Sequence, residues 1–407
     1  MNFNPVFRMI VCSDIHYGES EKCPEKFDYE GQERDRFEKA VEFAYAYADN
    51  CDYNKIDAFA AVGDFVTSGQ ESEMLAFKAS LDKVVRKDTE ILLSMASHEY
   101  FYDGVENATE RFVKIFGQPP VCRKTVNGFE LVAFSTDERC QTGPEKQVWL
   151  KTELKAACGI DEKKPVFMFY HPQFSDTVYG SAVLWRTSGI MRTVMNYPQI
   201  VCFGGHSHAP LNDPRTVHQK HFTSVGTGAI VGVSVCDMDR MPLDSKQSCG
   251  KAQLLIVEAD ADNRVRIQAM DGTNGKFFGD GWTVDCPSDP DSFVYTDDRY
   301  ITAKAPSFDE NARFSVECKN DTLIIDLDHA TDGGARVPGY NFVIKDKTGN
   351  IKKQISFSSS YYLYELPQSE HYECEFDAPA GEYLAECRAQ SYFDKLSDKI
   401  YAQFKKE

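Results

Sequence analysis

The sequence predicts an α/β domain followed by a smaller all-β domain. Two observations support this fold class in a chain of 407 residues. Up to about residue 288, short apolar runs alternate with amphipathic segments, which is typical of strands and helices in a layered α/β fold. Beyond that point, apolar residues recur at every second position, which is the period of a half-buried strand.

The first part combines strand-like and helix-like segments. Its apolar runs have the length of buried strands and cover residues 7–12, 58–62, 91–94, 131–134, 165–170 and 200–203. Between them, residues 32–48 place apolar side chains such as Phe37 and Val41 on one helical face and charges on the other. Residues 72–85 and 145–157 show the same pattern, so we expect helices at all three places.

The second part begins after a stretch rich in Pro and Asp, residues 286–291, which suits a linker. We therefore predict one domain over residues 1–288 and a second over residues 289–407. Turn signals recur between the short strands of the second domain, which indicates a β-sandwich. The segments DKTGN, SSSYY and APAGEY resemble fibronectin type III or immunoglobulin-like modules over about residues 300–407.

Charge and composition exclude several classes of protein. The 63 acidic and 45 basic residues give a net charge of −18, which disfavours binding to long nucleic acids or to anionic membranes. The apolar runs are too short to span a bilayer, and no signal peptide is visible at the start. The 13 cysteines include no CxxC pair and several lie in apolar runs, which is typical of free buried thiols. We expect a cytoplasmic protein, unless a leader preceded residue 1.

Chemically active side chains follow five of the apolar runs. The motifs are SDIH with Asp14 and His16, GDFV with Asp64, ASHEY with Ser97 and His98, YHP with His171, and GGHSH with His206 and His208. Because the carboxyl ends of strands form the functional crevice of an open α/β sheet, we expect these side chains to converge. Mixed Asp and His ligands suit first-row divalent metals, and two such ions about 3.5–4 Å apart can activate water for attack on phosphorus. Each motif is common alone, but five in order at strand ends favour a metal site.

The ordered series DxH, GD, xHE, H and GHxH resembles the calcineurin-like metallophosphoesterases over about residues 5–235. The resemblance implies a four-layer αββα sandwich with a dinuclear centre of two divalent ions (Mn, Fe or Zn) at the strand ends. The implied ligands are Asp14, His16, Asp64 and His208 for the first metal, and Asp64, Ser97, His171 and His206 for the second. Asp64 would bridge the ions. His98 would bind the phosphoryl oxygen or protonate the leaving group, so His98 and Asp64 are the implied catalytic residues.

Two departures from the family pattern affect this interpretation. The third motif usually reads Gly-Asn-His-Asp/Glu, but Ser97 occupies the Asn position, and its hydroxyl is a poorer ligand than an amide oxygen. The Ser/Thr protein phosphatases read GDxVDRG where this chain reads GDFVTSG. Thr67 and Ser68 therefore replace the acidic partner of the catalytic His and a phosphate-binding Arg. This argues against a protein phosphatase of that branch.

The substrate pocket has weaker sequence signals. Residues 174–186 follow His171 without a clean helical pattern, so Tyr179, Trp185 and Arg186 are candidate substrate contacts. The alternative is that the two aromatic residues are packing anchors, because aromatic side chains dominate protein cores. The stretch Tyr100–Tyr102 (YFY) also follows the third motif and could stack on a leaving group, with Tyr100 as the named candidate.

The leading functional hypothesis is a phosphoesterase that hydrolyses a small phosphomonoester or phosphodiester through a metal-bridging hydroxide. The alternative is a catalytically weakened metal-binding protein whose β-sandwich recognises a glycan or a protein. The complete set of Asp and His motifs favours the enzyme, since a decayed site would be expected to lose several ligands. Turnover of generic aryl phosphates with added Mn separates the two hypotheses.

Overall fold

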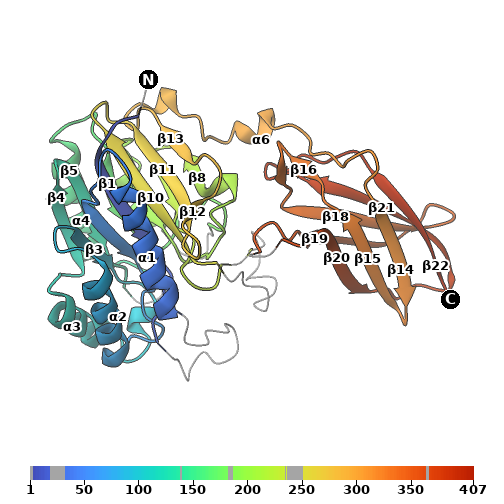
Figure 1. Cartoon of the computed structure of the whole chain (residues 1–407), viewed down its shortest axis with the longest axis horizontal. Coiled ribbons are helices and arrows are strands. Elements are labelled where there is room, and N and C mark those ends of the chain that lie inside the picture. Colours follow the sequence, from blue (N-terminus) through green and yellow to red (C-terminus); the bar gives the residue numbers. More distant parts are fainter. Residues whose placement is uncertain are drawn as a thin grey trace. The chain divides into compact units, whose positions relative to one another are not determined.

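The computed structural model describes residues 3–18, 33–137, 140–181, 187–233, 235, 251–363 and 366–407. The chain forms two compact units, Met1–Thr296 and Asp297–Glu407 (Figure 1). The sequence places the boundary earlier, after residue 288. The segment up to Thr296 belongs to the first unit because Gln219 holds it. The Gln219 N–H donates to the Tyr295 carbonyl at 2.9 Å, and its side-chain oxygen accepts from the N–H groups of Val294 and Tyr295 at 3.1 Å each.

The first unit contains a mixed seven-stranded sheet in the order β12-β11-β10-β1-β2-β3, with β13 paired to β11. Its strands are β1 (Pro5–Cys12), β2 (Ala58–Val62), β3 (Glu90–Ser94), β10 (Gln253–Asp260), β11 (Val265–Asp271), β12 (Lys276–Phe277) and β13 (Trp282–Val284). Strands β1, β2 and β3 are parallel, whereas β10 and β11 pair antiparallel. The carboxyl ends of β1, β2 and β3 therefore meet at one edge.

A second sheet of six strands has the order β4-β5-β6-β7-β9-β8. Its strands are β4 (Val121–Val126), β5 (Phe129–Phe134), β6 (Val166–Phe169), β7 (Ile200–Gly204), β8 (Val217–Gln219) and β9 (Thr223–Gly226). Strands β5, β6, β7 and β9 are parallel, and the two outer strands β4 and β8 are antiparallel to their neighbours.

Helices cover the outer face of each sheet and complete four layers (Figure 1). They are α1 (Glu33–Asp49), α2 (Glu71–Val84), α3 (Val105–Phe116), α4 (Pro144–Cys158) and α5 (Ser188–Val194). Alternate residues of β1 show the layering. Phe7 and Val11 pack between the sheets with Phe167 of β6, whereas Ile10 and Cys12 pack in the outer core with α1, α2 and α3. The predicted αββα sandwich is confirmed, and all three predicted helices form.

The second unit is all-β, as predicted. One sheet has the order β14-β15-β20 and the other β19-β18-β21-β22, and every pairing is antiparallel. These strands are β14 (Phe314–Lys319), β15 (Thr322–Asp328), β18 (Gly339–Asp346), β19 (Ile351–Ser358), β20 (Ser369–Glu375), β21 (Gly381–Gln390) and β22 (Ile400–Lys406). A two-stranded ribbon of β16 (Thr331–Asp332) and β17 (Ala335–Arg336) completes the unit. Its own apolar core includes Leu323, Ile325 and Leu327 at every second position of β15.

Short helical turns connect some of these elements: η1 (His98–Tyr100), η4 (Pro214–Thr216), η6 (Pro290–Ser292) and α6 (Arg299–Thr302). Within the described part of the chain, no helix has the length and apolar character needed to cross a membrane. The described cysteines are free thiols, as predicted.

Candidate metal centre

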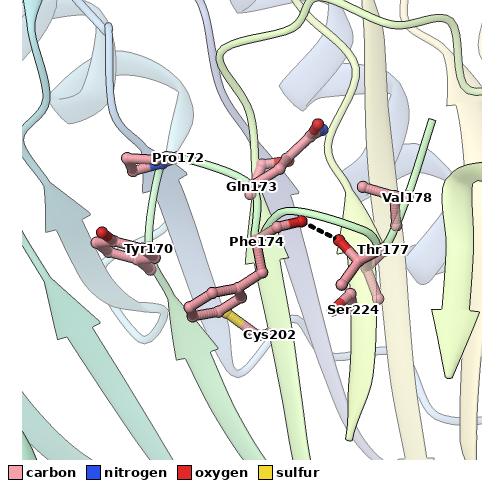
Figure 2. Close-up of a pocket in the computed structure, with 10 residues that line it drawn as sticks. Tyr170, Pro172, Gln173, Phe174, Thr177, Val178, Cys202 and Ser224 are labelled. Atoms are coloured by element: carbon pink, nitrogen blue, oxygen red, sulfur yellow. Dashed lines mark hydrogen bonds between the residues drawn. The ribbon is translucent and has the colours of Figure 1, made fainter. Parts of the chain in front are cut away.

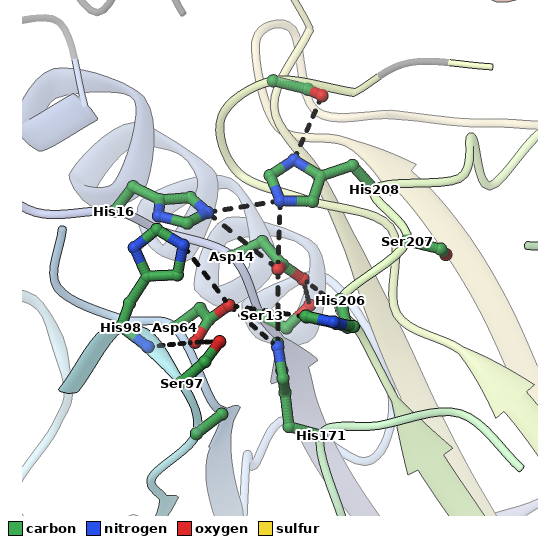
Figure 3. Close-up of polar contacts among 12 residues, drawn as sticks. Ser13, Asp14, His16, Asp64, Ser97, His98, His171, His206, Ser207 and His208 are labelled. Carbon is green, nitrogen blue, oxygen red and sulfur yellow. Dashed lines mark hydrogen bonds and ion pairs between the residues drawn. The ribbon is translucent and has the colours of Figure 1, made fainter. Parts of the chain in front are cut away.

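The five motifs converge at the carboxyl ends of strands from both sheets. Asp14 and His16 follow β1, Asp64 follows β2, Ser97 and His98 follow β3, His171 follows β6, and His206 and His208 follow β7. Figure 3 shows the five imidazole rings around the two carboxylates, while Ser207 points away from them. Three groups bring candidate ligand atoms within 4.8 Å of one another: Asp14, His16 and His208; Asp64, His171 and His206; and His16, Asp64 and His98.

Asp14 carries the first group. Its Oδ1 lies 3.2 Å from His208 Nε2, 3.8 Å from His171 Nε2 and 4.0 Å from His16 Nε2. This oxygen is fully buried and accepts no well-formed hydrogen bond from the described residues. Its other oxygen accepts hydrogen bonds from the Ser13 hydroxyl and, at 3.1 Å, from the backbone N–H of His206. The polar neighbours of Oδ1 are imidazole nitrogens that can bind a cation, so this oxygen has the environment of a metal ligand.

Asp64 links the two sides of the centre. Its Oδ2 lies 3.0 Å from His171 Nε2, 3.8 Å from His206 Nδ1 and 3.9 Å from His98 Nε2. Its Oδ1 accepts from the backbone N–H of His98 at 3.0 Å. Asp64 belongs to two of the three candidate ligand groups. This central position is the one that a bridging carboxylate requires.

Backbone carbonyls orient three of the imidazole rings. His171 Nδ1 lies 2.6 Å from the Val62 carbonyl, His208 Nδ1 lies 3.1 Å from the Gly232 carbonyl, and His98 Nδ1 lies 2.7 Å from the Thr67 carbonyl. A carbonyl oxygen only accepts, so each Nδ1 must carry the proton. In the neutral ring, the Nε2 lone pair then points into the cluster. His16 Nε2 and His208 Nε2 are 3.2 Å apart, so these two nitrogens and the Asp14 carboxylate lie close enough together to share one cation. Outer hydrogen bonds of this kind are typical of metal-binding histidines.

The backbone at the strand ends is conformationally unusual. Asp14, His16, Asp64, His206 and His208 all have left-handed φ angles, between 50° and 71°. Such conformations cost free energy in non-glycine residues and concentrate at functional sites. Two glycines leave space for the side chains of His171 and Asp14. A Cβ on Gly63 would lie 2.5 Å from His171 Cγ, and a Cβ on Gly205 would lie 2.4 Å from Asp14 Oδ2. The glycines of the GD and GH motifs are therefore sterically required.

The electrostatics couple the carboxylates to the histidines. Burial alone would raise the pKa of Asp14 and Asp64, but the nearby imidazoles outweigh it, so both pKa values lie below the ordinary range. Burial would lower the pKa of His171, but Asp64 and Asp14 raise it to about 10. The pKa of His208 is raised by Asp14 in the same way. His16 differs, because burial and then His98 and His208 lower its pKa well below the usual value.

Ser97 lies beside Asp64. Its hydroxyl donates to Asp64 Oδ1 across 3.4 Å, a long hydrogen bond (Figure 3). The hydroxyl is thus directed to the carboxylate that a second ion would share. The structure brings Ser97 to the centre, with its oxygen adjacent to Asp64 rather than among the imidazole nitrogens.

Glu99 is a residue that the sequence interpretation left without a role. It is fully buried, and its carboxylate accepts from the backbone N–H groups of Ala96 at 2.7 Å, Asp64 at 3.1 Å and Val66 at 3.2 Å. It therefore ties the loop after β3 to the loop that carries Asp64. Burial and the Asp64 charge raise its pKa to about 8. The only sequence signal for Glu99 is its place in the xHE motif, and that motif does not show which backbone N–H groups its carboxylate contacts.

Cys140 was also missed. It comes from the loop after β5, and its sulfur lies 3.9 Å from His206 Nε2. Burial, with Asp64 and Asp14 nearby, raises the pKa of this thiol to about 12. The neutral thiol therefore packs against the side of the His206 ring that faces away from Asp64.

The candidate substrate contacts have mixed outcomes. Trp185 and Arg186 lie outside the described residues. Tyr100 is in the core with 2% exposure, and its hydroxyl donates to the Thr136 carbonyl at 2.6 Å, so the prediction that Tyr100 stacks on a leaving group is wrong. Tyr179 is 9% exposed and packs beneath the Arg215 guanidinium, 4.1 Å from its ring centre, which fits the packing alternative.

A small pocket with an accessible volume of about 10 Å³ lies beside the segment that follows His171 (Figure 2). Its lining includes Tyr170, Gln173 and Phe174, together with Cys202 of β7. None of the candidate metal ligands lines it. It has room for about one water molecule, far less than a small-molecule site needs.

Comparison with known proteins agrees with this geometry. A family model described as calcineurin-like phosphoesterase matches residues 7–210, half of the chain. No curated protein matches the sequence. Among solved structures, a purple acid phosphatase from yellow lupin (Lupinus luteus) seeds is 14% identical, with a TM-score of 0.48 over 69% of this chain and 53% of its own.

Two further structures show comparable similarity. A 5′-nucleotidase precursor from Thermus thermophilus is 13% identical, with a TM-score of 0.36 over 65% of this chain and 54% of its own. GAP50, the anchor in the inner membrane complex of Plasmodium, is 10% identical, with a TM-score of 0.44 over 69% of this chain and 88% of its own. This chain thus spans about half the length of the lupin and Thermus proteins. On the match of its family model, the chain belongs to the calcineurin-like phosphoesterase family.

Proposed function

We propose that this chain is a phosphoesterase that uses two divalent cations to hydrolyse small phosphomonoesters or phosphodiesters. The observation that carries the proposal is the position of Asp64, whose Oδ2 faces His171, His206 and His98 within 3.9 Å. Asp14 Oδ1 likewise lies within 4.0 Å of the Nε2 atoms of His16 and His208. Two adjoining groups of nitrogen and oxygen ligands suit a pair of first-row ions such as Mn, Fe or Zn.

The residues present fit such ions. Asp14, His16 and His208 would hold one cation, His171 and His206 would hold the other, and Asp64 would contact both. Ser97 would support the second cation directly or through water. When bound, the cations would neutralise the phosphoryl oxygens and lower the pKa of an attacking water. The buried Asp14 Oδ1, which lacks a well-formed hydrogen bond, is consistent with this assignment.

His98 would transfer the proton to the leaving group. The Thr67 carbonyl fixes its Nδ1–H, and its Nε2 lies toward Asp64 with 19% of the side chain exposed. A proton on Nε2 would pass to the ester oxygen as the bond from that oxygen to phosphorus breaks, and His98 would regain a proton from the solvent. General acid catalysis of this kind contributes roughly 10²–10⁴-fold to rate.

Metal-dependent hydrolysis tests the proposal. The full chain is stripped with a chelator and titrated with Mn²⁺ while the release of nitrophenol is followed from p-nitrophenyl phosphate and bis(p-nitrophenyl) phosphate. We expect no turnover without metal and restored turnover with Mn²⁺. A protein that binds metal without hydrolysing either ester would contradict the proposal and favour the binding-protein alternative.

A further inference from the structure

Phe101 follows the proposed proton donor and is unusual in its exposure. It is 51% exposed, and no other phenylalanine in the described ranges is classed as exposed. Its neighbour Tyr100 is buried at 2%. Exposing a phenyl ring to water forgoes the free energy of its burial, so an exposed ring beside a catalytic centre is a candidate for contact with substrate.

The chain holds Phe101 in a fixed position relative to the metal centre. Tyr100 anchors the turn through its hydrogen bond to the Thr136 carbonyl, and the Phe101 N–H donates to the His98 carbonyl at 3.4 Å. The rings of His98 and Phe101 have centroids 4.5 Å apart and are tilted by 45°. His98 is itself fixed by Thr67 and by the backbone contact with Asp64. A ring on such a supported turn can position a ligand with little loss of entropy.

The position of this ring indicates what it would contact. In the proposed reaction, the ester oxygen that leaves phosphorus must come within hydrogen-bonding distance of His98 Nε2. The group attached to that oxygen then extends past the His98 ring, which Phe101 flanks. We propose that Phe101 is the specificity-determining platform for the leaving group, and that the preferred substrates are phosphoesters of planar aromatic groups, either aryl or nucleoside esters. This inference rests on the proposed function.

The adjacent Tyr102 has a different environment. It is 54% exposed, but its ring lies beneath the Arg111 guanidinium, 6.0 Å from the ring centre, and Arg111 is held by Asp103 at 2.7 and 2.9 Å. On this turn, the ring that contacts His98 among the described residues is that of Phe101. Phe101 is therefore the residue whose replacement should change leaving-group preference.

The test compares three leaving groups in the metal-loaded full chain: phenyl, adenosine (through its 5′ oxygen) and glycerol. They are supplied as monoesters or methyl diesters, whichever form the parent turns over. The variant Phe101→Leu keeps an apolar side chain but loses the planar ring. Leu75→Ala on α2, which also changes a side chain that is 51% exposed, is the matched control.

We expect Phe101→Leu to lower kcat/KM by about 5- to 10-fold for a planar leaving group, as loss of an aromatic stacking contact would, mainly through KM. The glycerol ester should change less than twofold, and Leu75→Ala should change none of the three. A selective loss with the phenyl ester assigns aryl substrates, and one with the adenosine ester assigns nucleoside substrates.

Equal losses with all three esters would overturn the inference and show that Phe101 only shields His98. No loss with any ester would also overturn it. A parent protein that hydrolyses none of the esters would instead contradict the proposed function. Metal content and thermal unfolding of Phe101→Leu, measured on the same samples, separate a specificity effect from misfolding.

Discussion

His98 Nδ1 lies 2.7 Å from the backbone carbonyl oxygen of Thr67. At this position of the sequence the acidic partner of the protein phosphatases is absent, and the carbonyl supplies the acceptor instead. The Thr67 hydroxyl donates to the carbonyls of His16 at 2.7 Å and Gly18 at 3.0 Å, which holds the loop in place. The carbonyl fixes the orientation of the His98 ring without adding a negative charge. His98 is thus oriented toward Asp64 by the backbone.

Replacing His98 should separate proton transfer from metal binding. The variant His98→Asn should lower kcat by roughly 10²–10⁴-fold, because the general acid is lost, while its metal content stays near that of the parent. Elemental analysis and steady-state kinetics on the same samples give both quantities. His98 lies within ligand range of His16 and Asp64, so a parallel loss of metal and activity would identify it as a ligand instead.

Metal binding at neutral pH should release protons. The pKa of His171 is about 10 in the metal-free protein because Asp64 and Asp14 outweigh its burial, and the pKa of His208 is also raised. A ring whose pKa lies above the ambient pH holds a proton that a metal ion must displace. The apparent affinity should therefore rise with pH, by about tenfold per pH unit for each proton released. Calorimetric titration at pH 7 in buffers of different ionisation enthalpy measures the number of protons released per chain, and a value of zero would contradict the protonation assigned to His171.

Glu99 should act as a positioning residue. At pH 9, above its pKa of about 8, Glu99 is a carboxylate that only accepts, whereas a Gln keeps one acceptor oxygen and turns an amide donor toward the backbone N–H groups of Asp64, Ala96 or Val66. We expect Glu99→Gln to weaken metal affinity by about tenfold or more, as the loss of outer support for a ligand does.

Glu73→Gln is the matched control for Glu99→Gln. Glu73 is also buried and accepts from the N–H groups of Ser68 and Gly69 at 2.9 Å each, in the same loop but without touching Asp64. Its replacement should lower the unfolding temperature with a smaller effect on metal affinity. Metal titration and thermal unfolding are compared for both variants, and equal effects of the two on metal affinity would remove the special role of Glu99.

The second cation should be held more weakly than the first. The Ser97 hydroxyl is directed to Asp64 Oδ1 at 3.4 Å, and a hydroxyl is a shorter and poorer ligand than the amide of the usual Asn. We expect Ser97→Asn to raise affinity at the weaker site by about tenfold or more and to increase activity at limiting Mn²⁺, with less gain at saturation. Superimposable Mn²⁺ activation curves for the two proteins would show that position 97 does not limit the second site.

Much of the fold and the ligand set could be predicted because both depend on local patterns. Buried parallel strands form continuous apolar runs, and the ligands follow them directly, as Asp64 follows β2. Contacts between segments that are distant in the sequence leave no such local pattern, so they could not be predicted. The Thr67 carbonyl that orients His98 has no side-chain signature, and Cys140 reaches His206 only through the loop after β5.

The sequence also could not predict which aromatic side chain after His98 is exposed to solvent. The stretch Tyr100–Phe101–Tyr102 has an aromatic side chain at every position, so its pattern does not show which ring faces the core. The turn that begins at His98 buries Tyr100 and leaves Phe101 exposed. The helix Val105–Phe116 and the β10–β11 hairpin were not predicted either. Strand β10 of this hairpin pairs with β1, and the paired residues are more than 240 positions apart in the sequence. No local pattern indicates a pairing over that distance.

The central claim is that Asp64 joins two cations in one hydrolytic centre, and metal stoichiometry measured together with turnover tests it most directly. The parent should hold two ions per chain. Asp64→Asn should lose at least one of them and lower kcat by at least about a hundredfold, or about 2.7 kcal/mol. Asp260→Asn, which changes a buried carboxylate opposite the start of β1, should match the parent in both respects. Two ions per chain and near-parental turnover in Asp64→Asn would contradict the account.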